Sequence, residues 1–176
     1  MIPLDKKEAR KRGLYRRSLI PEEERIRRSG MIFEKIRPLL DQYQVIGCYV
    51  SMRDEADTKQ ILQYCFDKGK TAAVPETTDS TLRFHVIHSF DDLTPGKFGV
   101  MEPVDCPVIP TDRIELMIVP LSSFDAYNHR TGYGRGYYDS VLLPEHLKAG
   151  IAFSEQFVDH INADPWDIPL DLIVQA

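Results

Sequence analysis

The chain has 176 residues, of which 43% are hydrophobic, and a formal net charge of −5. A chain of this length is expected to form one domain, residues 1–176, that buries about 70% of the surface exposed in the unfolded chain. No apolar run reaches the length of a membrane span, and the N-terminal segment is charged and helical rather than signal-like. These features exclude a membrane-spanning protein and predict a soluble, cytoplasmic monomer.

The three cysteines argue against an oxidising compartment. Cys48, Cys65 and Cys106 are odd in number and widely spaced, and no two of them have the spacing of metal ligands. They predict neither a disulfide framework nor a metal centre, and they fit a reducing compartment.

Positive charge is concentrated near the N-terminus. Residues 1–37 contain twelve of the 22 Lys and Arg residues but six of the 27 acids. Three interpretations are open. The acids alternate with the basic residues at helical spacing, which favours a solvated helix face. Some of the cations would alternatively bind phosphate. Nucleic-acid binding is disfavoured, because the whole chain is acidic and few aromatic residues lie among the cations.

The first third of the chain predicts two helices followed by a central strand. Asp5 and Glu8 have the spacing of a capping box, and the helix that they begin is expected to run to Ser18. Pro21 begins the second helix, whose apolar positions are Ile26, Ile32, Phe33, Ile36, Leu39 and Leu40. The apolar run 45–50 is typical of a buried parallel strand.

The middle of the chain predicts a helix and two strands. Asp57 or Thr58 caps the helix, which ends at Gly69 and presents Ile61, Leu62, Cys65 and Phe66 on one face. Residues 71–74 form the next strand. Polar and apolar residues alternate over 82–88, which indicates an antiparallel addition to the sheet. His85 and His88 then point to opposite faces, so a metal pair is not expected and solvent exposure or core packing is the default.

The last part of the chain predicts an irregular connection over 95–110, rich in proline and glycine, followed by more strands. The expected strands are 116–119, 149–153 and 172–174, with a short helix over 137–143. Strands alternate with helices along the chain. We therefore expect the α/β class: a single-domain, three-layer fold with an open, mostly parallel mixed sheet and helices on both faces.

Residues 132–139, with the sequence Gly-Tyr-Gly-Arg-Gly-Tyr-Tyr-Asp, are the strongest functional signal. Glycines at alternate positions let successive backbone N–H groups approach an anion, and Arg135 adds a fork of donors. The predicted helix that follows would place its N-terminus beside the same anion, and Asp139 would hold a cation against it. The spacing is neither a Walker loop nor a complete dinucleotide fingerprint, so a purely structural turn with packed tyrosine rings is the alternative.

Four segments together resemble the 5-formyltetrahydrofolate cyclo-ligase family, also called methenyltetrahydrofolate synthetases. They are Lys6–Arg10, Ser51–Thr58, Gly96–Pro103 and Gly132–Asp139, with Ile118–Pro120 ahead of Phe124 and Asp125. The resemblance covers essentially the whole chain in the right order. It implies an open α/β enzyme that uses MgATP to close 5-formyltetrahydrofolate into 5,10-methenyltetrahydrofolate, with release of ADP and phosphate.

The resemblance also implies roles for individual residues. Arg135 and Tyr137 would be catalytic. Asp139 and Asp167 match the family's Mg²⁺ ligands, and ATP is the cosubstrate. The implied ATP contacts are Lys6, Lys7, Arg10, Arg130, Gly132, Tyr133, Gly134, Arg135, Gly136, Tyr137 and Tyr138. The implied folate contacts are Val50, Glu55, Tyr133, Gly134, Arg135, Gly136 and Tyr137.

The chain departs from the family pattern near its C-terminus. Trp166 stands where the family usually has histidine before the second metal-binding aspartate, and the chain ends Gln175-Ala176 in place of Thr-Glu. Asp164 and Asp171 therefore remain alternatives to Asp167. A non-catalytic binding relative and an RNA-associated module remain the alternative functions, although no nucleic-acid partner is expected.

Overall fold

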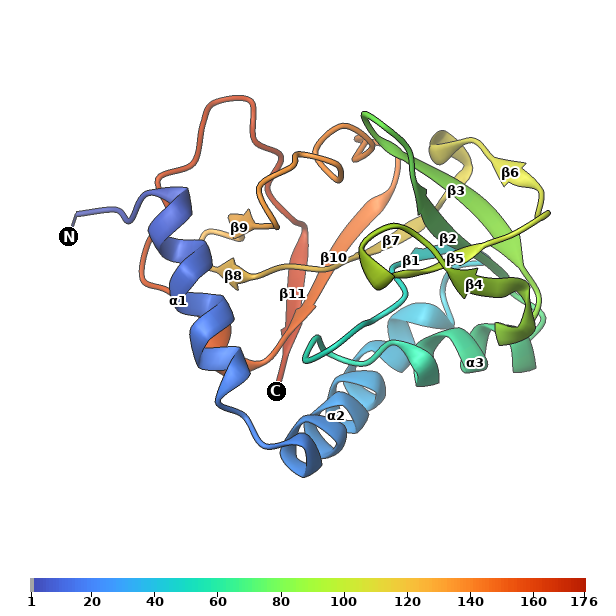
Figure 1. Cartoon of the computed structure of the whole chain (residues 1–176), viewed down its shortest axis with the longest axis horizontal. Coiled ribbons are helices and arrows are strands. Elements are labelled where there is room, and N and C mark those ends of the chain that lie inside the picture. The colour runs from blue at the N-terminus through green and yellow to red at the C-terminus, as the bar shows by residue number, and fades with distance from the viewer. Residues whose placement is uncertain (1) are drawn as a thin grey trace.

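The computed structural model describes residues 2–176, and its centre is a seven-stranded mixed sheet with the order β11-β10-β7-β1-β2-β3-β6 (Figure 1). The neighbours from β11 to β2 pair in parallel, whereas β2–β3 and β3–β6 are antiparallel. The strands are β1 (Val45–Cys48), β2 (Thr71–Thr77), β3 (Leu82–Ile87), β6 (Val108–Ile109), β7 (Leu116–Val119), β10 (Leu147–Ala152) and β11 (Leu172–Gln175). The predicted α/β class, the central parallel strand and the antiparallel addition are confirmed.

Three α-helices precede or interrupt the first strands: α1 (Lys6–Ser18), α2 (Glu22–Leu40) and α3 (Lys59–Asp67). Asp5 caps α1 as predicted, because its side chain accepts a hydrogen bond from the Glu8 N–H at 2.7 Å. Asp57 accepts from the Lys59 N–H at 2.8 Å at the start of α3. Gly69, with a φ of 67°, follows the C-terminus of α3.

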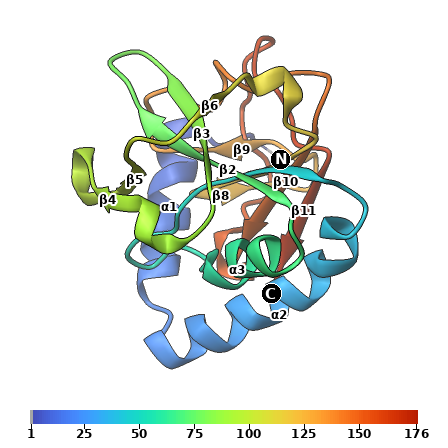
Figure 2. The same ribbon diagram turned by 90° about the vertical axis from the view of Figure 1, so that its right-hand side faces the viewer.

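One face of the sheet packs against α2 and α3. Both helices lie on the same side of the sheet in two perpendicular views (Figures 1 and 2). Alternate strand residues such as Ile46 and Ile118 meet Ile32, Ile36 and Leu62 from the helices in one buried cluster. The helical periodicity of the sequence therefore identified this layer, apart from Ile26, which was expected on the apolar face but is 63% exposed.

The opposite face is covered largely by irregular chain. Met117 and Val119 of β7 pack there against Val141, Leu142 and Leu170. The short helix expected over 137–143 is wrong, because this segment forms consecutive turns. In these turns the N–H groups of Val141 and Leu142 both donate hydrogen bonds to the Tyr138 carbonyl oxygen. The helix that was expected to follow the glycine loop therefore contributes no dipole to it.

Two small antiparallel pairs accompany the main sheet. The connection predicted as irregular over 95–110 contains β5 (Met101–Pro103), which pairs with β4 (Leu93–Pro95) at its start, and it also contains β6. A second hairpin consists of β8 (Ser123–Phe124) and β9 (Arg130–Thr131). The remaining short elements are the 3₁₀ turns η1 (Phe90–Asp92), η2 (Lys97–Gly99), η3 (Thr111–Arg113) and η4 (Ser154–Gln156).

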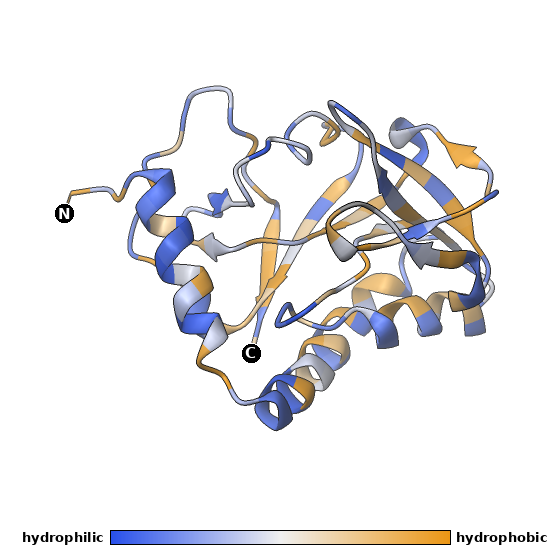
Figure 3. Cartoon of the chain, in the orientation of Figure 1, coloured by the Kyte–Doolittle hydropathy of each residue, from blue (hydrophilic) through white to orange (hydrophobic). Residues whose placement is uncertain are grey.

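Helix α1 lies at the side of the sheet, against the β8–β9 hairpin and η4. It is mostly hydrophilic (Figure 3), and it buries Ala9, Gly13 and Arg17. Ala9 packs with Val158 and Ile161 in a small separate core. The position of α1 beside the hairpin brings the basic N-terminal segment next to the glycine loop, which follows β9.

Two further expectations concern single residues and membrane spans. His85 is buried and bonds the Cys106 carbonyl oxygen and the Glu76 carboxylate, whereas His88 is exposed. Both outcomes match the default interpretation of these histidines.

Within residues 2–176, no helix combines the length and the apolar character that crossing a bilayer requires.

Candidate active site

A cavity of about 620 Å³ opens where β1 and β7 end. Val50 follows β1, Pro120 follows β7, and Pro75 lies in β2, so the carboxyl edge of the parallel strands forms the floor of the cavity. From β1 the chain first extends the sheet through β2 and β3, and later returns to the other side of β1 with β7. Open α/β sheets bind their ligands at such a switch point.

A glycine allows α1 to pack closely on the cavity wall. A Cβ atom built on Gly13 would lie 1.9 Å from the Ser122 carbonyl oxygen, so only glycine fits in this position. Lys6, Arg10 and Arg17 share the Gly13 side of the helix and line the cavity. The Arg10 Nε donates to the Gly132 carbonyl oxygen at 2.8 Å. The helix therefore holds its cations against the glycine loop.

Arg17 connects three segments that are far apart in the sequence. Its guanidinium contacts Asp54 Oδ1 at 2.9 Å and donates to the Tyr133 hydroxyl at 3.2 Å. The Tyr133 hydroxyl in turn donates to Glu55 Oε2 at 2.8 Å. The side chain of Arg17 is only 6% exposed. Sequence reasoning did not select Arg17, although it stands seven residues after Arg10 on the same helix face.

Burial changes the proton affinity of this network. Burial raises the pKa of Glu55, against the hydrogen bonds from the Met52 N–H and Tyr133 that lower it. Burial also raises the pKa of Tyr133, with a further contribution from the nearby Glu55 charge. Burial lowers the pKa of Arg17, but the charges and hydrogen bonds of Tyr133, Asp54 and Glu55 outweigh it and raise the pKa overall. Glu55 is therefore a carboxylate that would gain from further hydrogen-bond donors.

The glycine loop runs from Gly132 to Gly136 along the cavity. Gly134 and Gly136 have φ values of 88° and 69°, which L-residues with side chains rarely adopt. A Cβ atom on Gly134 would lie 3.4 Å from the Arg10 guanidinium carbon. Across the cavity, the Arg135 guanidinium stacks over the Phe98 ring at 4.6 Å from its centroid. Phe98 belongs to the Gly96–Pro103 segment, which carried part of the family resemblance.

Arg130 is a buried cation at the start of the loop. Its side chain is 6% exposed, it approaches Asp139 Oδ1 at 3.3 Å, and it lies over the Tyr138 ring. Burial lowers the pKa of Arg130, and the charges of Asp139 and Asp167 oppose this change. Its Nε is buried and has no hydrogen-bond partner among residues 2–176. An unpaired donor on a buried guanidinium is costly unless a ligand satisfies it.

The predicted metal-binding aspartates both line the cavity, but in different surroundings. The Asp139 side chain is 44% exposed and contacts Arg130. Asp167 pairs with Lys6 and accepts from the Asp164 N–H at 2.8 Å. Lys6 also pairs with Asp164 at 2.6 Å, and these two carboxylates raise the pKa of Lys6 although burial lowers it. Asp171 instead accepts from the Lys148 N–H at 2.7 Å and does not line the cavity.

The cavity collects almost all of the predicted site residues. Every one lines it except Lys7, which is exposed on α1. The residues that were not predicted include Arg17, Met52, Arg53, Phe98, Trp166 and Tyr49. Trp166 is 76% exposed at the rim, immediately before Asp167. Which ligand each side chain contacts stays a prediction.

The fold and the cavity define an open α/β protein with a cation-lined pocket at its switch point. The model of the 5-formyltetrahydrofolate cyclo-ligase family matches residues 4–176, and the chain belongs to this family. The chain is 28% identical to 5-formyltetrahydrofolate cyclo-ligase of Escherichia coli (strain K12), over 90% of this chain and 93% of that protein. It is also 28% identical to the Mus musculus cyclo-ligase, with 93% and 92% covered.

Solved structures agree with this assignment. The 5,10-methenyltetrahydrofolate synthetase of Aquifex aeolicus superposes with a TM-score of 0.86 at 31% identity, over 97% of this chain and 89% of that one. The synthetase of Mycoplasma pneumoniae superposes with a TM-score of 0.79 at 25% identity, over 97% and 98%. The family resemblance seen in the sequence is therefore confirmed. The chain is an enzyme, and its family and relatives indicate 5-formyltetrahydrofolate cyclo-ligase activity.

Proposed function

We propose that the chain uses ATP and Mg²⁺ to convert 5-formyltetrahydrofolate into 5,10-methenyltetrahydrofolate, with release of ADP and phosphate through a phosphorylated formyl intermediate. The observation that carries the proposal is the convergence of Lys6, Arg10, Arg130 and Arg135 on one cavity at the carboxyl edge of the sheet. Four cations exceed what a neutral ligand needs, and they suit a triphosphate beside an anionic folate.

The chemistry explains why ATP is required. An N-formyl group is an amide, so its carbon is a poor electrophile and its oxygen a poor leaving group. Attack of the formyl oxygen on the γ-phosphorus forms a new O–P bond, breaks the bond to the β-phosphate and releases ADP. N10 then attacks the carbon of the resulting iminium phosphate and loses its proton, and phosphate leaves with the oxygen. The protein aligns the reactants and neutralises the charge on the transferring group.

The cavity residues divide naturally between these tasks. Lys6 and Arg10 come from α1, Arg130 comes from β9, and Arg135 comes from the glycine loop, so the four cations would hold the triphosphate. The unpaired Nε of Arg130 is available for a phosphate oxygen. Tyr137, which also lines the cavity, would pack beside the reacting groups.

Glu55 and Tyr133 suit the folate end. Glu55 already accepts from the Met52 N–H at 2.9 Å and from Tyr133. Each carboxylate oxygen can accept a second hydrogen bond, so Glu55 would receive the donor edge of the pterin. The raised pKa of the half-buried Glu55 means that such donors would relieve the cost of desolvating its charge.

The donor set near the phosphates fits Mg²⁺. Asp139 and Asp167 offer hard carboxylate oxygens on the cavity wall, and Mg²⁺ usually takes one or two carboxylates and completes its shell with water and phosphate oxygens. Bound there, Mg²⁺ would supply neutralising charge to the phosphates. Asp139 is the stronger candidate ligand, because its side chain is 44% exposed and its contact with Arg130 is 3.3 Å long, whereas the Asp167 side chain is 18% exposed and closely paired with Lys6. A cytoplasmic, monomeric enzyme without a nucleic-acid partner stays a prediction.

One experiment tests the reaction. Purified protein is mixed with MgATP and 5-formyltetrahydrofolate, and the near-ultraviolet band of the methenyl product is followed together with ADP. We expect one ADP per methenyl product, with neither product formed when Mg²⁺ or folate is omitted. ADP release without the methenyl band would indicate a different acceptor. Absence of both signals would favour a binding module, and specific retention of RNA would favour the nucleic-acid alternative.

A single substitution tests the assignment of Asp139 as a Mg²⁺ ligand. Asp139→Asn removes a charge from a half-exposed loop side chain rather than core volume, so the fold should persist while turnover is largely lost. Circular dichroism checks the fold, and the Mg²⁺ dependence of the residual rate checks the role. An unchanged rate with unchanged Mg²⁺ dependence would remove Asp139 from the site.

A further inference from the structure

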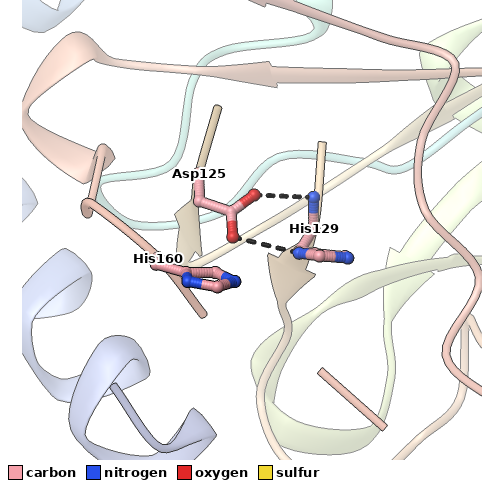
Figure 4. A group of neighbouring side chains, drawn as sticks. All are labelled: Asp125, His129 and His160. Atoms are coloured by element: carbon pink, nitrogen blue, oxygen red, sulfur yellow. Dashed lines mark hydrogen bonds and ion pairs between the residues drawn. The ribbon is translucent and has the colours of Figure 1, made fainter. Parts of the chain in front are cut away.

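A cluster of Asp125, His129 and His160 lies outside the cavity and has no part in the proposed reaction (Figure 4). One potential ligand atom from each side chain lies within 4.8 Å of the other two. Asp125 is 1% exposed, whereas the two histidines are half-buried. Two imidazoles and a carboxylate are the donor set that borderline transition metals such as Zn²⁺ prefer.

The carboxylate of Asp125 is held rigidly by backbone donors. Its Oδ1 accepts from the N–H groups of Tyr127 at 2.9 Å and His129 at 3.0 Å, and its Oδ2 accepts from the Ile161 N–H at 2.9 Å. These bonds fix the orientation of the group from two segments that are distant in the sequence. Hydrogen bonds that orient a ligating carboxylate are typical of metal sites, because they lower the cost of organising the ligands.

The spacing of the donor atoms also suits one ion. His129 Nδ1 lies 3.0 Å from Asp125 Oδ2, and two ligands that each bind an ion at about 2.0–2.2 Å are separated by about this distance. The rings of His129 and His160 are nearly parallel, with an interplanar angle of 14°. In Figure 4 the Asp125 carboxylate lies above the two rings, and one nitrogen of each ring lies on the side near the carboxylate.

We propose that Asp125, His129 and His160 bind one divalent transition-metal ion of the Zn²⁺ type, with water completing the coordination. On binding, the ion takes the Nδ1 lone pair of His129, and the proton that Nδ1 donates to Asp125 in the metal-free protein moves to Nε2 of the same ring. Neutral imidazole stays neutral, so the exchange is balanced. Asp125 keeps its three backbone donors and contributes Oδ2 to the ion.

The place of the cluster in the fold gives such an ion a structural effect. The Leu4 N–H donates to the His160 carbonyl oxygen at 2.8 Å, and Leu4 forms a β-bridge with Ile161. The N-terminal segment, the β8–β9 hairpin and the chain after Phe157 therefore meet here. Each continues within four residues into a charged group near the cavity, namely Lys6, Arg130 and Asp164. An ion at this point would tie the three segments together.

An ion can reach the cluster from solvent. His160 lines a small second cavity of about 240 Å³ beside the N-terminal segment, and the His129 side chain is 27% exposed. Partial exposure leaves room for the water ligands, while buried Asp125 supplies a fixed anchor.

The test uses the full-length protein, freed of metal with a chelator and titrated with ZnCl₂ in a calorimeter. We expect one ion per chain. At a free Zn²⁺ concentration about one hundred times its Kd, the ion should raise Tm by about 5–10 °C. His160→Asn and His129→Asn should each weaken binding by at least tenfold. His88→Asn, which replaces an exposed histidine far along the chain, is the matched control and should bind as the wild type does.

Cobalt distinguishes this site from the free cysteines. Co²⁺ bound by imidazole and carboxylate should give visible d–d bands without the near-ultraviolet thiolate charge-transfer band that Cys106 would add. Circular dichroism of both histidine variants confirms that they fold, so their loss of binding is not a loss of structure. Sub-stoichiometric binding, a thiolate band, or wild-type affinity in a folded His160→Asn protein would overturn the proposal.

Discussion

Helices α1 and α2 are both rich in Arg and Lys, but their cations have different partners. On α1, Lys6, Arg10 and Arg17 contact residues that are more than thirty positions away and line the cavity. On α2, Arg27 and Arg37 pair with Glu24 and Glu34 one turn away on the same helix. The number of charges on a helix therefore does not identify a binding face. Distant partners alone do not identify it either, because Arg28 of α2 pairs with Glu155 and does not line the cavity. The cavity-lining cations of α1 are marked by their contacts with the glycine loop and the other cavity residues.

The α2 pairs illustrate why local ion pairs carry little functional weight. Hydrogen bonds from Arg27 and Arg28 lower the pKa of Glu24 to about 2. The Arg27 side chain is nevertheless 61% exposed, and water screens such a pair on both sides. The Arg17 side chain is 6% exposed and bonds groups in two other segments. The solvated-face interpretation of the basic segment thus describes Arg27 and Arg37 of α2. The phosphate-binding interpretation remains for the cavity face of α1.

The largest expected effect separates these two sets of cations. In the double variant Lys6→Ala/Arg10→Ala, phosphate contacts worth a few kcal/mol together would be lost, so the KM for ATP should rise by about a hundredfold. The KM for folate should change much less. Arg27→Ala/Arg37→Ala is the matched control and should leave both constants within about twofold. Steady-state kinetics of the wild type and the two double variants measures these constants, and equal effects in the two variants would contradict a phosphate-binding role for the α1 cations.

The glycines of the two helices provide a comparison of packing. A Cβ on Gly13 would strike the Ser122 carbonyl at 1.9 Å, whereas a Cβ on Gly30 of α2 meets only the Gln60 Oε1 at 3.7 Å. Gly13→Ala should therefore destabilise the fold by about 1–3 kcal/mol or more. Gly30→Ala should stabilise it by roughly 0.5–1 kcal/mol, because alanine restricts the unfolded chain. Urea unfolding measures both changes, and the same sign for both would contradict the close approach of α1.

The sequence predicted the elements whose stability is local or periodic. Asp5 and Glu8 located the start of α1, and continuous apolar runs located β1 and β7. The segment 137–143 was misjudged because Tyr137, Tyr138, Val141 and Leu142 have helical spacing in the sequence. Their packing against the sheet could not be seen from that pattern. There the positive φ of Gly136 and the packing of Val141 and Leu142 on the sheet favour turns over a helix.

The sequence predicted those site residues that lie in recognisable motifs, and it missed Arg17, which lies in none. The loop 132–139 is visible in the sequence because its glycines are clustered. Arg17 acts through Tyr133, which is 116 positions away, so no local pattern reveals its partner. The helical face shared by Lys6, Arg10 and Arg17 was the available signal, and it required knowing that Gly13 turns this face toward the protein.

A third prediction concerns Arg17 itself. Arg17→Lys keeps the charge but replaces a planar fork with a single ammonium, which cannot bond both Asp54 and Tyr133 in the same geometry. We expect a loss of about 1–3 kcal/mol of stability and a rise in the KM for folate that exceeds the rise for ATP, because Tyr133 positions Glu55. Arg16→Lys on the exposed neighbouring position is the control. Equal behaviour of the two variants would place Arg17 among the solvated cations.

The smallest expected effect is the pH dependence of stability, which has opposite signs for Glu55 in the cavity and Glu24 on α2. Burial raises the pKa of Glu55, so its ionised form is penalised in the folded protein and stability is lost as pH rises through that pKa. Glu24 behaves oppositely: Arg27 and Arg28 lower its pKa to about 2, and the stability it contributes is lost as pH falls below the unfolded value of about 4.3.

Glu55→Gln should therefore raise Tm of the ligand-free protein at pH 7, and Glu24→Gln should lower it slightly. Both differences from the wild type should shrink as the pH is brought from 7 toward 3, because Glu55 becomes protonated in both folded and unfolded states and Glu24 progressively loses its advantage. Thermal melts of the three proteins across this range check the signs. A lower Tm for Glu55→Gln at pH 7 would mean that Arg17 and Tyr133 stabilise the Glu55 charge more than burial penalises it, and Glu55 would then be a structural anchor that needs no donors from the pterin.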